Sequence, residues 1–261
     1  MNTEYLNEQL KVNGKLAKII YFEELESTNL FAKQHYSELE SNTLILTSYQ
    51  TQGKGRFDRK WQSEKDKNLT FSLIYAADLN TDEFHLVNFY TSYIFYLTIK
   101  SLIREYQNSY IRLKWPNDIL LNGKKVAGIL TDVKDTEIAY KKFIIGAGLN
   151  VNMNDFSAEI ERKATSLRKE FNTEFDIEKI LTAFINNFYD NAGLVKEQQT
   201  LMKKWNEASD MKNNTITFRQ SENEKEITAV AETVDTDGGL VIINESGIRS
   251  KYYSGEISLI Y

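Results

Sequence analysis

Residues 110–133 read YIRLKWPNDILLNGKKVAGILTDV, and this stretch decides the class of the fold. Its Asn122-Gly123 pair is the dipeptide most typical of a two-residue β-hairpin turn. The apolar runs on either side are therefore predicted as two antiparallel strands, the second over residues 124–133. Residues 110–114 are predicted as another strand, which ends before Pro116 because proline cannot donate to the hydrogen-bond ladder of a sheet.

Further strands and helices are predicted on both sides of this hairpin. The strands lie over residues 16–22, 43–49, 69–77 and 138–151. The helices run from a cap at Ser27, Thr28 or Asn29 to about Leu39, over residues 81–106, and over residues 176–205. Hairpin-connected strands with helices inserted between them are typical of an α+β fold with a mixed or antiparallel sheet.

The pattern of the chain changes near Lys212. Short alternating segments follow over residues 215–219, 227–233, 240–244 and 255–260, and turn residues separate them. A tail of this length and pattern predicts a small β-barrel. The chain is therefore divided into a larger domain, residues 1–211, and a C-terminal domain, residues 212–261.

Composition excludes several classes of function. The chain has no cysteine, which excludes disulfides, thiolate metal sites and cysteine nucleophiles, and two histidines are too few for a multi-histidine metal centre. A Ser–His–Asp triad has only His35 and His85 as candidate bases. The net charge of −5 argues against a general nucleic-acid binder. The first nine residues are unlike a signal peptide, and no apolar run approaches the roughly 20 residues of a membrane span, so a cytoplasmic enzyme or binding protein is expected.

A basic, glycine-containing segment lies within a long polar loop predicted over residues 50–68. It reads GKGRFDRKW from Gly53 to Trp61. Two glycines let backbone amides approach an anion, and arginine grips a carboxylate or phosphate with two parallel hydrogen bonds. Trp61 offers a flat face to a base or another ring. Taken alone, the loop is equally consistent with a solvated basic turn anchored by one tryptophan.

Two polar residues follow Pro116 at the end of a predicted strand. Asn117 and Asp118 could reach a ligand from this position, or they could cap a rigid turn. On the returning strand, strict alternation places Lys125 on the same face as Ala127. If Val126 instead faces the core, Lys125 is an exposed edge lysine.

Glycines interrupt two of the predicted strands. Gly128 lies in the first, and Gly146 and Gly148 lie in the second. Glycine inside a strand often marks the close approach of a ligand or of another backbone. A crowded sheet interior explains the same residues equally well.

The order and spacing of these segments resemble the signature series of biotin protein ligases. The matching segments are residues 26–29 (ESTN), 50–61, 114–118 (KWPND), 125–130 (KVAGIL), 146–150 (GAGLN), 165–167 (TSL) and 255–259 (GEISL). The resemblance covers roughly residues 16–261. It implies a catalytic domain of the biotin/lipoate ligase type with a C-terminal SH3-like barrel. It also implies that ATP and Mg²⁺ activate biotin as biotinyl-5′-AMP, from which a lysine of a carboxylase's biotin carboxyl carrier domain takes the biotin.

The resemblance also implies roles for individual residues. Those expected to bind biotin are Ser27, Thr28, Asn29 and Gln50 at the ureido ring, Gly53, Lys54, Gly55 and Arg56 around the carboxylate, and Lys125, Gly128 and Gly148. Those expected to bind ATP or the adenylate are Arg56, Arg59, Trp61, Asn117, Lys125 and Asn150. Lys125 and Arg56 are expected to be catalytic, and Asp118 is expected to orient the incoming lysine or to help hold Mg²⁺.

Two residues depart from the family pattern. Lys54 stands where many relatives have arginine, which keeps the charge and loses the bidentate fork. Asp58 stands where glycine is common, which lowers the local positive potential and restricts the backbone, although aspartate tolerates a left-handed φ better than most residues. We expect slower or weaker adenylate retention, not loss of activity.

Larger members of the family carry an N-terminal winged helix of roughly 60 residues that binds DNA. The family pattern begins here near Leu16, so we expect a ligase without repressor function or a DNA partner. A homodimer that forms through the sheet is possible. The rival interpretations are a lipoate-type ligase, a non-catalytic biotin sensor, and a single-strand nucleic-acid binder that uses the basic loop.

Overall fold

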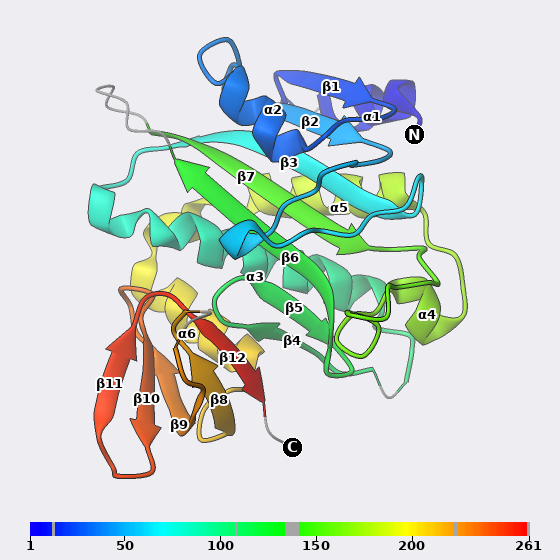
Figure 1. Ribbon diagram of the computed structural model, residues 1–261. Helices are drawn as coiled ribbons and strands as arrows, with labels where there is room; N and C mark the ends of the chain where they lie inside the picture. The colour runs from blue at the N-terminus through cyan, green and yellow to red at the C-terminus, as the bar shows by residue number, and fades with distance from the viewer. Residues whose placement is uncertain (12–13, 108, 134–140, 222–223, 260–261) are drawn as a thin grey trace.

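A seven-stranded mixed sheet forms the centre of the computed structural model, which describes residues 1–11, 14–107, 109–133, 141–221 and 224–259 (Figure 1). In spatial order its strands are β1 (Lys18–Phe22), β2 (Thr43–Thr47), β3 (Asn68–Ala77), β7 (Lys141–Asn150), β6 (Lys124–Val133), β5 (Asp118–Leu121) and β4 (Ile111–Lys114). Only the β1–β2 pairing is parallel among these neighbours. The predicted α+β class and the hairpin at Asn122-Gly123 are both confirmed.

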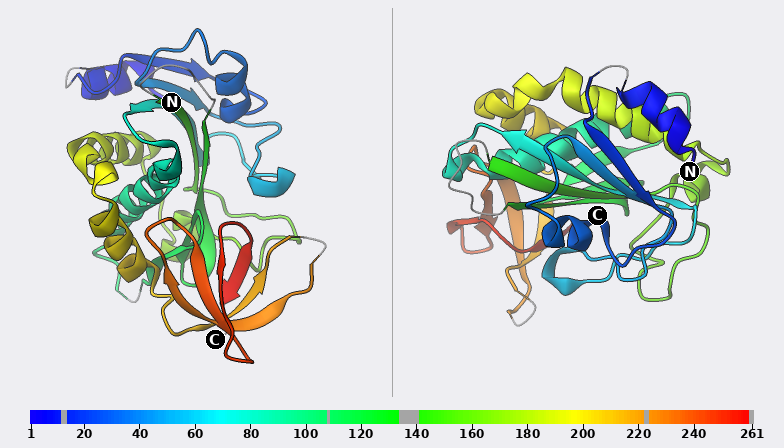
Figure 2. Two further views of the ribbon diagram at one scale, coloured as in Figure 1. Left: turned by 90° about the vertical axis from the view of Figure 1, so that its left-hand side faces the viewer. Right: turned by 90° about the horizontal axis from the view of Figure 1, so that it is seen from above.

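Helices cover the sheet unequally on its two faces. They are α1 (Thr3–Lys11), α2 (Thr28–Gln34), α3 (His85–Leu102), α4 (Leu167–Phe171), α5 (Ile177–Asp190) and α6 (Gln198–Ser209). Helices α3 and α5 pack on one face over the main core, and α2 lies on the opposite face over a smaller cluster (Figure 2). The loop that joins β2 to β3 crosses another part of that opposite face (Figure 1).

Helix α3 is buried along most of its surface, as its run of aromatic and aliphatic residues predicts. Its predicted bounds were too wide, because a separate 3₁₀ turn, Thr81–Glu83, precedes it and the helix ends at Leu102. Helix α2 likewise ends earlier than predicted, at Gln34. Among the described residues, no helix has the length and apolar character needed to cross a membrane.

The single helix predicted over residues 176–205 is wrong. Helix α5 ends at Asp190, a 3₁₀ segment covers Ala192–Lys196, and α6 begins at Gln198. Asn191 and Gly193 explain the break, since both residues are poor helix formers. The break redirects α6 towards the C-terminal domain. Helices α1 and α4 and strand β11 were not predicted, and residues 138–140 of the predicted strand lie outside the described residues.

The C-terminal domain is a five-stranded antiparallel sheet. Its strands are β8 (Thr215–Arg219), β9 (Ile227–Val234), β10 (Leu240–Asn244), β11 (Arg249–Tyr252) and β12 (Glu256–Leu259), in the order β11-β10-β9-β8-β12. Its buried side chains, such as Ile216 and Ile257, are continuous with the main core. The small β domain predicted here is confirmed.

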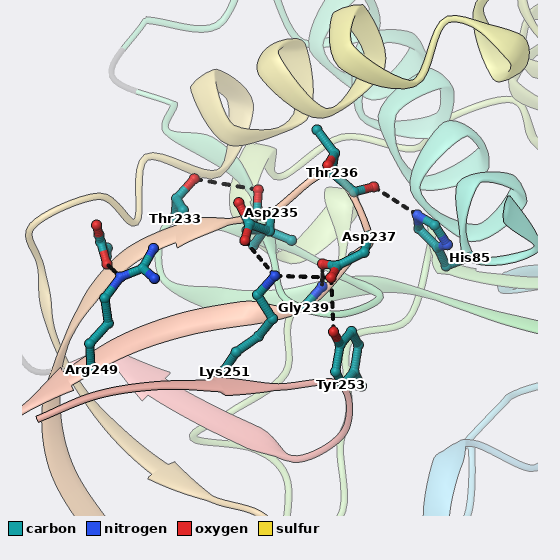
Figure 3. A network of polar contacts seen from close by, with 12 residues as sticks. His85, Thr233, Asp235, Thr236, Asp237, Gly239, Arg249, Lys251 and Tyr253 are labelled. Atoms are coloured by element: carbon teal, nitrogen blue, oxygen red, sulfur yellow. Dashed lines mark hydrogen bonds and ion pairs between the residues drawn. The ribbon is translucent and has the colours of Figure 1, made fainter. Parts of the chain in front are cut away.

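The turn between β9 and β10 attaches this domain to the larger one (Figure 3). The carbonyl oxygen of Thr236 lies 2.9 Å from Nε2 of His85 on α3, and Nε1 of Trp115 donates to the carbonyl of Gly238 over 3.1 Å. Gly238 has a φ of +80°, and a Cβ there would lie 2.9 Å from the rings of His85 and Phe89. Only glycine fits this turn closely against α3, and the attachment places β12 beside the open face of the large sheet.

Candidate functional site

A β-bulge in strand β6 determines where Lys125 points. Leu120 on β5 pairs with Lys125, whereas its neighbour Ile119 pairs with Ala127. Val126 is therefore the extra residue and has no partner on β5. An extra residue of this kind interrupts the alternation of side chains between the two faces of a sheet.

The bulge overturns the predicted placement of Lys125. Ala127 and Ile129 face the helix-covered core, where their exposed fractions are 0% and 1%. Lys125 lies instead on the open face with Gly128, although Val126 is itself buried. The sequence had placed Lys125 either on the face of Ala127 or at an exposed edge. Neither placement is complete, because a strict two-residue alternation does not include a bulge.

The open face of the sheet is the floor of a cavity of about 460 Å³. One row of residues crosses four strands, and a second row lies beside it. The first row is Thr70, Gly148, Gly128 and Asp118, and the second is Ser72, Gly146 and Leu130. Three of these seven positions are glycine, so the floor leaves room above the backbone for other side chains.

Each of the three glycines accommodates one predicted site residue. A Cβ at Gly146 would lie 2.3 Å from Oδ1 of Asn29, and a Cβ at Gly148 would lie 2.6 Å from the ring of Trp61. At Gly128 the nearest atoms, at 3.0 Å, belong to the end of the Lys125 side chain. The glycines therefore mark a close approach of side chains, which is one of the two interpretations that the sequence left open.

The cavity brings together every predicted site residue except Gly53. The lining residues predicted from sequence are Ser27, Thr28, Asn29, Gln50, Lys54, Gly55, Arg56, Arg59, Trp61, Asn117, Asp118, Lys125, Gly128, Gly148 and Asn150. Gly53 lies just outside, where a Cβ would meet the carbonyl oxygen of Trp61 at 2.8 Å and Nε2 of Gln50 at 2.9 Å. It allows the two ends of the loop to pack together.

One end of the cavity is a buried hydrogen-bonded network. Ser27 caps α2 by accepting from the amide of Leu30, and Oε1 of Gln50 accepts from the amide of Thr28 over 2.9 Å. The hydroxyl of Ser72 lies 2.9 Å from that of Thr28 and 2.6 Å from Oδ1 of Asn29. These polar side chains are all at least nine-tenths buried, so their bonds are formed at low dielectric.

The middle of the cavity holds an ion pair. Nζ of Lys125 lies 2.6 Å from Oδ1 of Asp118, and 5.7 Å from the centre of a Trp61 ring. The indole N–H of Trp61 is buried and has no hydrogen-bond partner in the described part of the chain. A ligand acceptor placed beside Trp61 would remove this unfavourable state.

The remaining end is cationic and belongs to the loop. Its short 3₁₀ turn, Arg56–Asp58, contains Phe57 in a left-handed conformation with a φ of +56°. The amide of Gly55 donates to the carbonyl of Arg59 over 2.7 Å, which closes the turn.

Contacts from strand β12 hold the loop in place. Arg59 forms an ion pair with Glu256, whose other oxygen lies 3.3 Å from Nη2 of Arg219, and Nη1 of Arg56 donates to the carbonyl of Gly255 over 3.4 Å. Burial alone would raise the pKa of the Glu256 carboxyl, but the hydrogen bonds and charges of Arg59 and Arg219 hold it below its ordinary value. The loop is therefore tied to the C-terminal domain by charge.

Lys114 is a further cation of the cavity wall. Burial lowers the pKa of its ammonium group, and the charge of Asp118 opposes this shift. Burial likewise lowers the pKa of the Arg56 guanidinium. Both shifts indicate positive charges that lack part of their hydration, and these attract an anionic ligand strongly.

The two predicted asparagines form bonds within the protein. Nδ2 of Asn117 donates to the carbonyl of Ile129 over 2.6 Å. Asn150 accepts from Nδ2 of Asn68 over 3.0 Å and donates to the carbonyl of Thr165 over 3.0 Å. Both therefore hold the cavity wall together, whatever they also contact in a ligand.

Several residues that line the cavity were not predicted from the sequence. They are Phe156, Ile160, Arg162, Lys163, Ala164 and Glu256. The buried Ser72, which contacts Thr28, was not predicted either. Lys163 and Thr165 exchange backbone hydrogen bonds with Lys125 across the bulge. Residues 156–164 lack a recognisable sequence pattern, whereas Thr165 and Glu256 lie in the matching segments TSL and GEISL, in which no residue was assigned a role.

The carboxylates of the cavity are few. Asp118 offers one oxygen beyond its contact with Lys125, and both oxygens of Glu256 contact arginines. The described residues contain no group of three His, Asp or Glu side chains that could hold a metal ion. Any Mg²⁺ would therefore need phosphate oxygens and water as its main ligands, as this ion commonly has.

Comparisons with known proteins agree with the fold of both parts of the chain. The model of the biotin/lipoate A/B protein ligase family matches residues 20–150, and that of the biotin protein ligase C terminal domain matches residues 213–260. The bifunctional ligase/repressor BirA of Bacillus subtilis (strain 168) is 33% identical over 66% of this chain and 54% of its own length. Its namesake in Bacillus spizizenii is 29% identical over 92% of this chain and 74% of its own length.

A solved structure covers nearly the whole chain. The biotin protein ligase from Aquifex aeolicus in complex with biotin and ATP is 27% identical to it, with a TM-score of 0.73. The match covers 94% of this chain and 99% of the Aquifex chain. The agreement extends over both the large sheet and the C-terminal domain.

Proposed function

Because the chain belongs to the biotin/lipoate A/B protein ligase family, we propose that it is an ATP-dependent biotin protein ligase. It would form biotinyl-5′-AMP and transfer the biotin to one lysine of a biotin carboxyl carrier domain. The observation that carries this proposal is one continuous cavity with a buried hydrogen-bonding end and a cationic end, joined at Lys125. The buried end suits the neutral ureido ring of biotin, and the cations suit its carboxylate and the phosphates of ATP.

Biotin would lie with its ureido ring at the buried end. The ring has two N–H donors and one carbonyl acceptor, which match the hydroxyl and amide groups of Ser27, Thr28, Asn29 and Gln50. Its valeryl chain would cross the glycine floor at Gly146 and Gly148. Its carboxylate would then reach Lys125 in the middle of the cavity.

ATP would occupy the cationic end. Arg56, Arg59 and Lys114 would face its phosphates, and Trp61, Phe156 and Ile160 would supply apolar surface for adenine. A carboxylate oxygen of biotin attacks the α-phosphorus, and the bond to the pyrophosphate leaving group breaks. Lys125 and Arg56 would stabilise the negative charge that accumulates on the transferring phosphoryl group.

Transfer to the carrier completes the reaction. The neutral ε-amine of the carrier lysine attacks the acyl carbon, and the bond to AMP breaks as the amide forms. The amine also loses a proton, which Asp118 is placed to accept or to direct to solvent. Mg²⁺, when bound to ATP, would offset phosphate charge, and Asp118 is the carboxylate best placed to contact it.

The proposal extends to the organisation and location of the protein. We assign the catalytic domain to residues 1–211 and the C-terminal domain to residues 212–261, with the ion pair between Arg59 and Glu256 as one link between them. The carrier domain of a carboxylase would be the protein partner. The reaction would take place in the cytoplasm, where ATP is available.

Intact-mass spectrometry tests this function directly. The protein is incubated with ATP, Mg²⁺, biotin and a carrier domain, and a parallel reaction contains lipoate instead of biotin. We expect one biotinyl group on one lysine and no reaction with lipoate, whose dithiolane ring has no N–H to donate at the buried end. Modification by lipoate alone would show a lipoate-type ligase, and tight biotin binding without modification would show a non-catalytic sensor.

A further inference from the structure

We propose that Ser72 and Asp132 are positioning residues that fix which groups at the buried end accept hydrogen bonds and which donate them. The geometry is a directed chain of hydrogen-bonding contacts that links Thr28, Ser72, Asn29 and Asp132. Its effect is to favour a ligand that presents an N–H beside a carbonyl oxygen. This inference rests on the proposed function, because biotin is the ligand of that kind that the cavity would take.

Asp132 fixes the orientation of the Asn29 amide. Nδ2 of Asn29 lies 3.2 Å from Oδ2 of Asp132 and 3.4 Å from the carbonyl oxygen of Leu130. The same Oδ2 lies 2.9 Å from Nζ of Lys33. Both contacts of Nδ2 are with groups that only accept, so the amide nitrogen must face them and Oδ1 must face Ser72.

Ser72 contacts both Asn29 and Thr28 and so connects their side chains. Oδ1 of Asn29 can only accept, so at 2.6 Å it takes the single hydroxyl proton of Ser72. The hydroxyl oxygen of Thr28 lies 2.9 Å from that of Ser72, and Thr28 donates its own proton to Oε1 of Gln50 over 3.3 Å. The Thr28 proton is therefore engaged by Gln50, and the Thr28 oxygen can accept from a ligand in the cavity.

Ser27 has the complementary polarity. Its hydroxyl oxygen accepts from the amide of Leu30 as the cap of α2, which leaves its own proton as a donor. Adjacent residues therefore offer one donor, Ser27, and one acceptor, Thr28. A cyclic urea presents a carbonyl acceptor and an N–H donor side by side, which is the matching pair.

Two near-isosteric variants test the directed chain. In Asp132→Asn the new amide can donate to Asn29, whose own amide is then no longer held in one orientation. In Ser72→Ala the link to Thr28 is removed. We expect the Kd for biotin, measured by calorimetry, to rise about tenfold in each variant, while the KM for ATP in pyrophosphate exchange stays within about twofold. A loss of general packing would instead change both constants.

A second ligand, 2-iminobiotin, tests whether the arrangement of donors and acceptors at the buried end determines which ligand is preferred. In 2-iminobiotin a nitrogen replaces the urea oxygen, so the wild-type protein should prefer biotin, and this preference should shrink in both variants. Asp78→Asn is the matched control, because Asp78 forms an exposed ion pair with Lys196, and it should leave both affinities unchanged. If the wild-type protein binds biotin and both variants keep its affinity and preference, this inference is wrong and the proposed function stands. If the wild-type protein does not bind biotin, both are wrong.

Discussion

The two ends of the cavity are built on different physical principles. The buried end consists of side chains on β3, α2 and their neighbours, which bond to one another away from water. The cationic end consists of a loop whose Arg59 contacts Glu256 of β12 through a partly exposed ion pair. Bonds formed at low dielectric are costly to break and insensitive to salt, whereas exposed ion pairs are weak and screened. Selection of biotin should therefore reside at the buried end, and retention of the nucleotide at the cationic end.

The largest expected effect comes from the residue between the two ends. Lys125→Ala should lower the rate of carrier labelling by at least about a hundredfold, because a positive charge beside the reacting oxygens is lost. The measurement is biotin transfer under single-turnover conditions. Lys124→Ala is the control, since this neighbouring lysine does not line the cavity. Labelling by the Lys125 variant at the wild-type rate would remove it from the mechanism.

Alanine substitutions in the glycine floor test the contributions of the two ends of the cavity separately. Gly146→Ala would place a methyl group against Asn29 and should weaken biotin binding about tenfold, with little change in the KM for ATP. Gly148→Ala would displace Trp61 and should chiefly raise the KM for ATP, with a smaller effect on biotin, whose valeryl chain also crosses this position. Both constants come from pyrophosphate exchange titrated with each substrate.

Gly193→Ala is the control for both glycine variants. A Cβ at Gly193 would meet no atom within 4 Å, so neither constant should change. If Gly146→Ala and Gly148→Ala change the same constant by the same factor, the division of the cavity into two ends is incorrect.

A smaller effect is expected where the C-terminal domain holds the loop. Glu256→Gln should speed adenylate dissociation about threefold in low salt, because Arg59 and Arg219 lose a charged partner. The difference should disappear in 1 M salt, where the Debye length is about 3 Å. Since the pKa of Glu256 is depressed, wild-type retention by this pair persists at neutral pH and is lost only as the pH falls through that lowered value.

Glu232→Gln provides the matched comparison. Glu232 forms an ion pair with Arg249 on the same domain, and neither residue lines the cavity. Its loss should leave adenylate dissociation unchanged at every salt concentration. Equal effects of the two variants would mean that the C-terminal domain acts through its stability alone.

The smallest change concerns the departure from the family pattern in the loop. Lys54→Arg restores a planar fork that can grip a carboxylate with two hydrogen bonds. We expect adenylate dissociation to slow by no more than about threefold, since Lys54 lies at the cavity edge and is exposed to water. Adenylate chase experiments measure this rate, and a faster release would contradict the role given to residue 54.

Much of the fold followed from local signals. Asn122-Gly123 predicted the hairpin, and the run of aromatic residues after residue 81 predicted the buried helix α3. The break after Asp190 was missed because the apolar pattern continues through it, and only Asn191 and Gly193 indicate it. Local patterns report which residues are buried, but not where the chain turns to reach another domain.

The sequence predicted most of the residues that line the cavity, but not the contacts that connect them. Motif spacing placed Thr28 and Lys125 in one cavity. It could not supply Ser72 or Asp132, which act through contacts across strands, nor the bulge that turns Lys125 to the open face. Such contacts depend on register, and a one-residue change of register moves every side chain to the other face.

Pyrophosphate exchange with biotin and lipoate in separate reactions tests the central claim most directly. The assay measures label moving from pyrophosphate into ATP, so it reports carboxylate activation without any carrier protein. The account predicts exchange that depends on biotin and is absent with lipoate. Exchange driven by lipoate and not by biotin would contradict it.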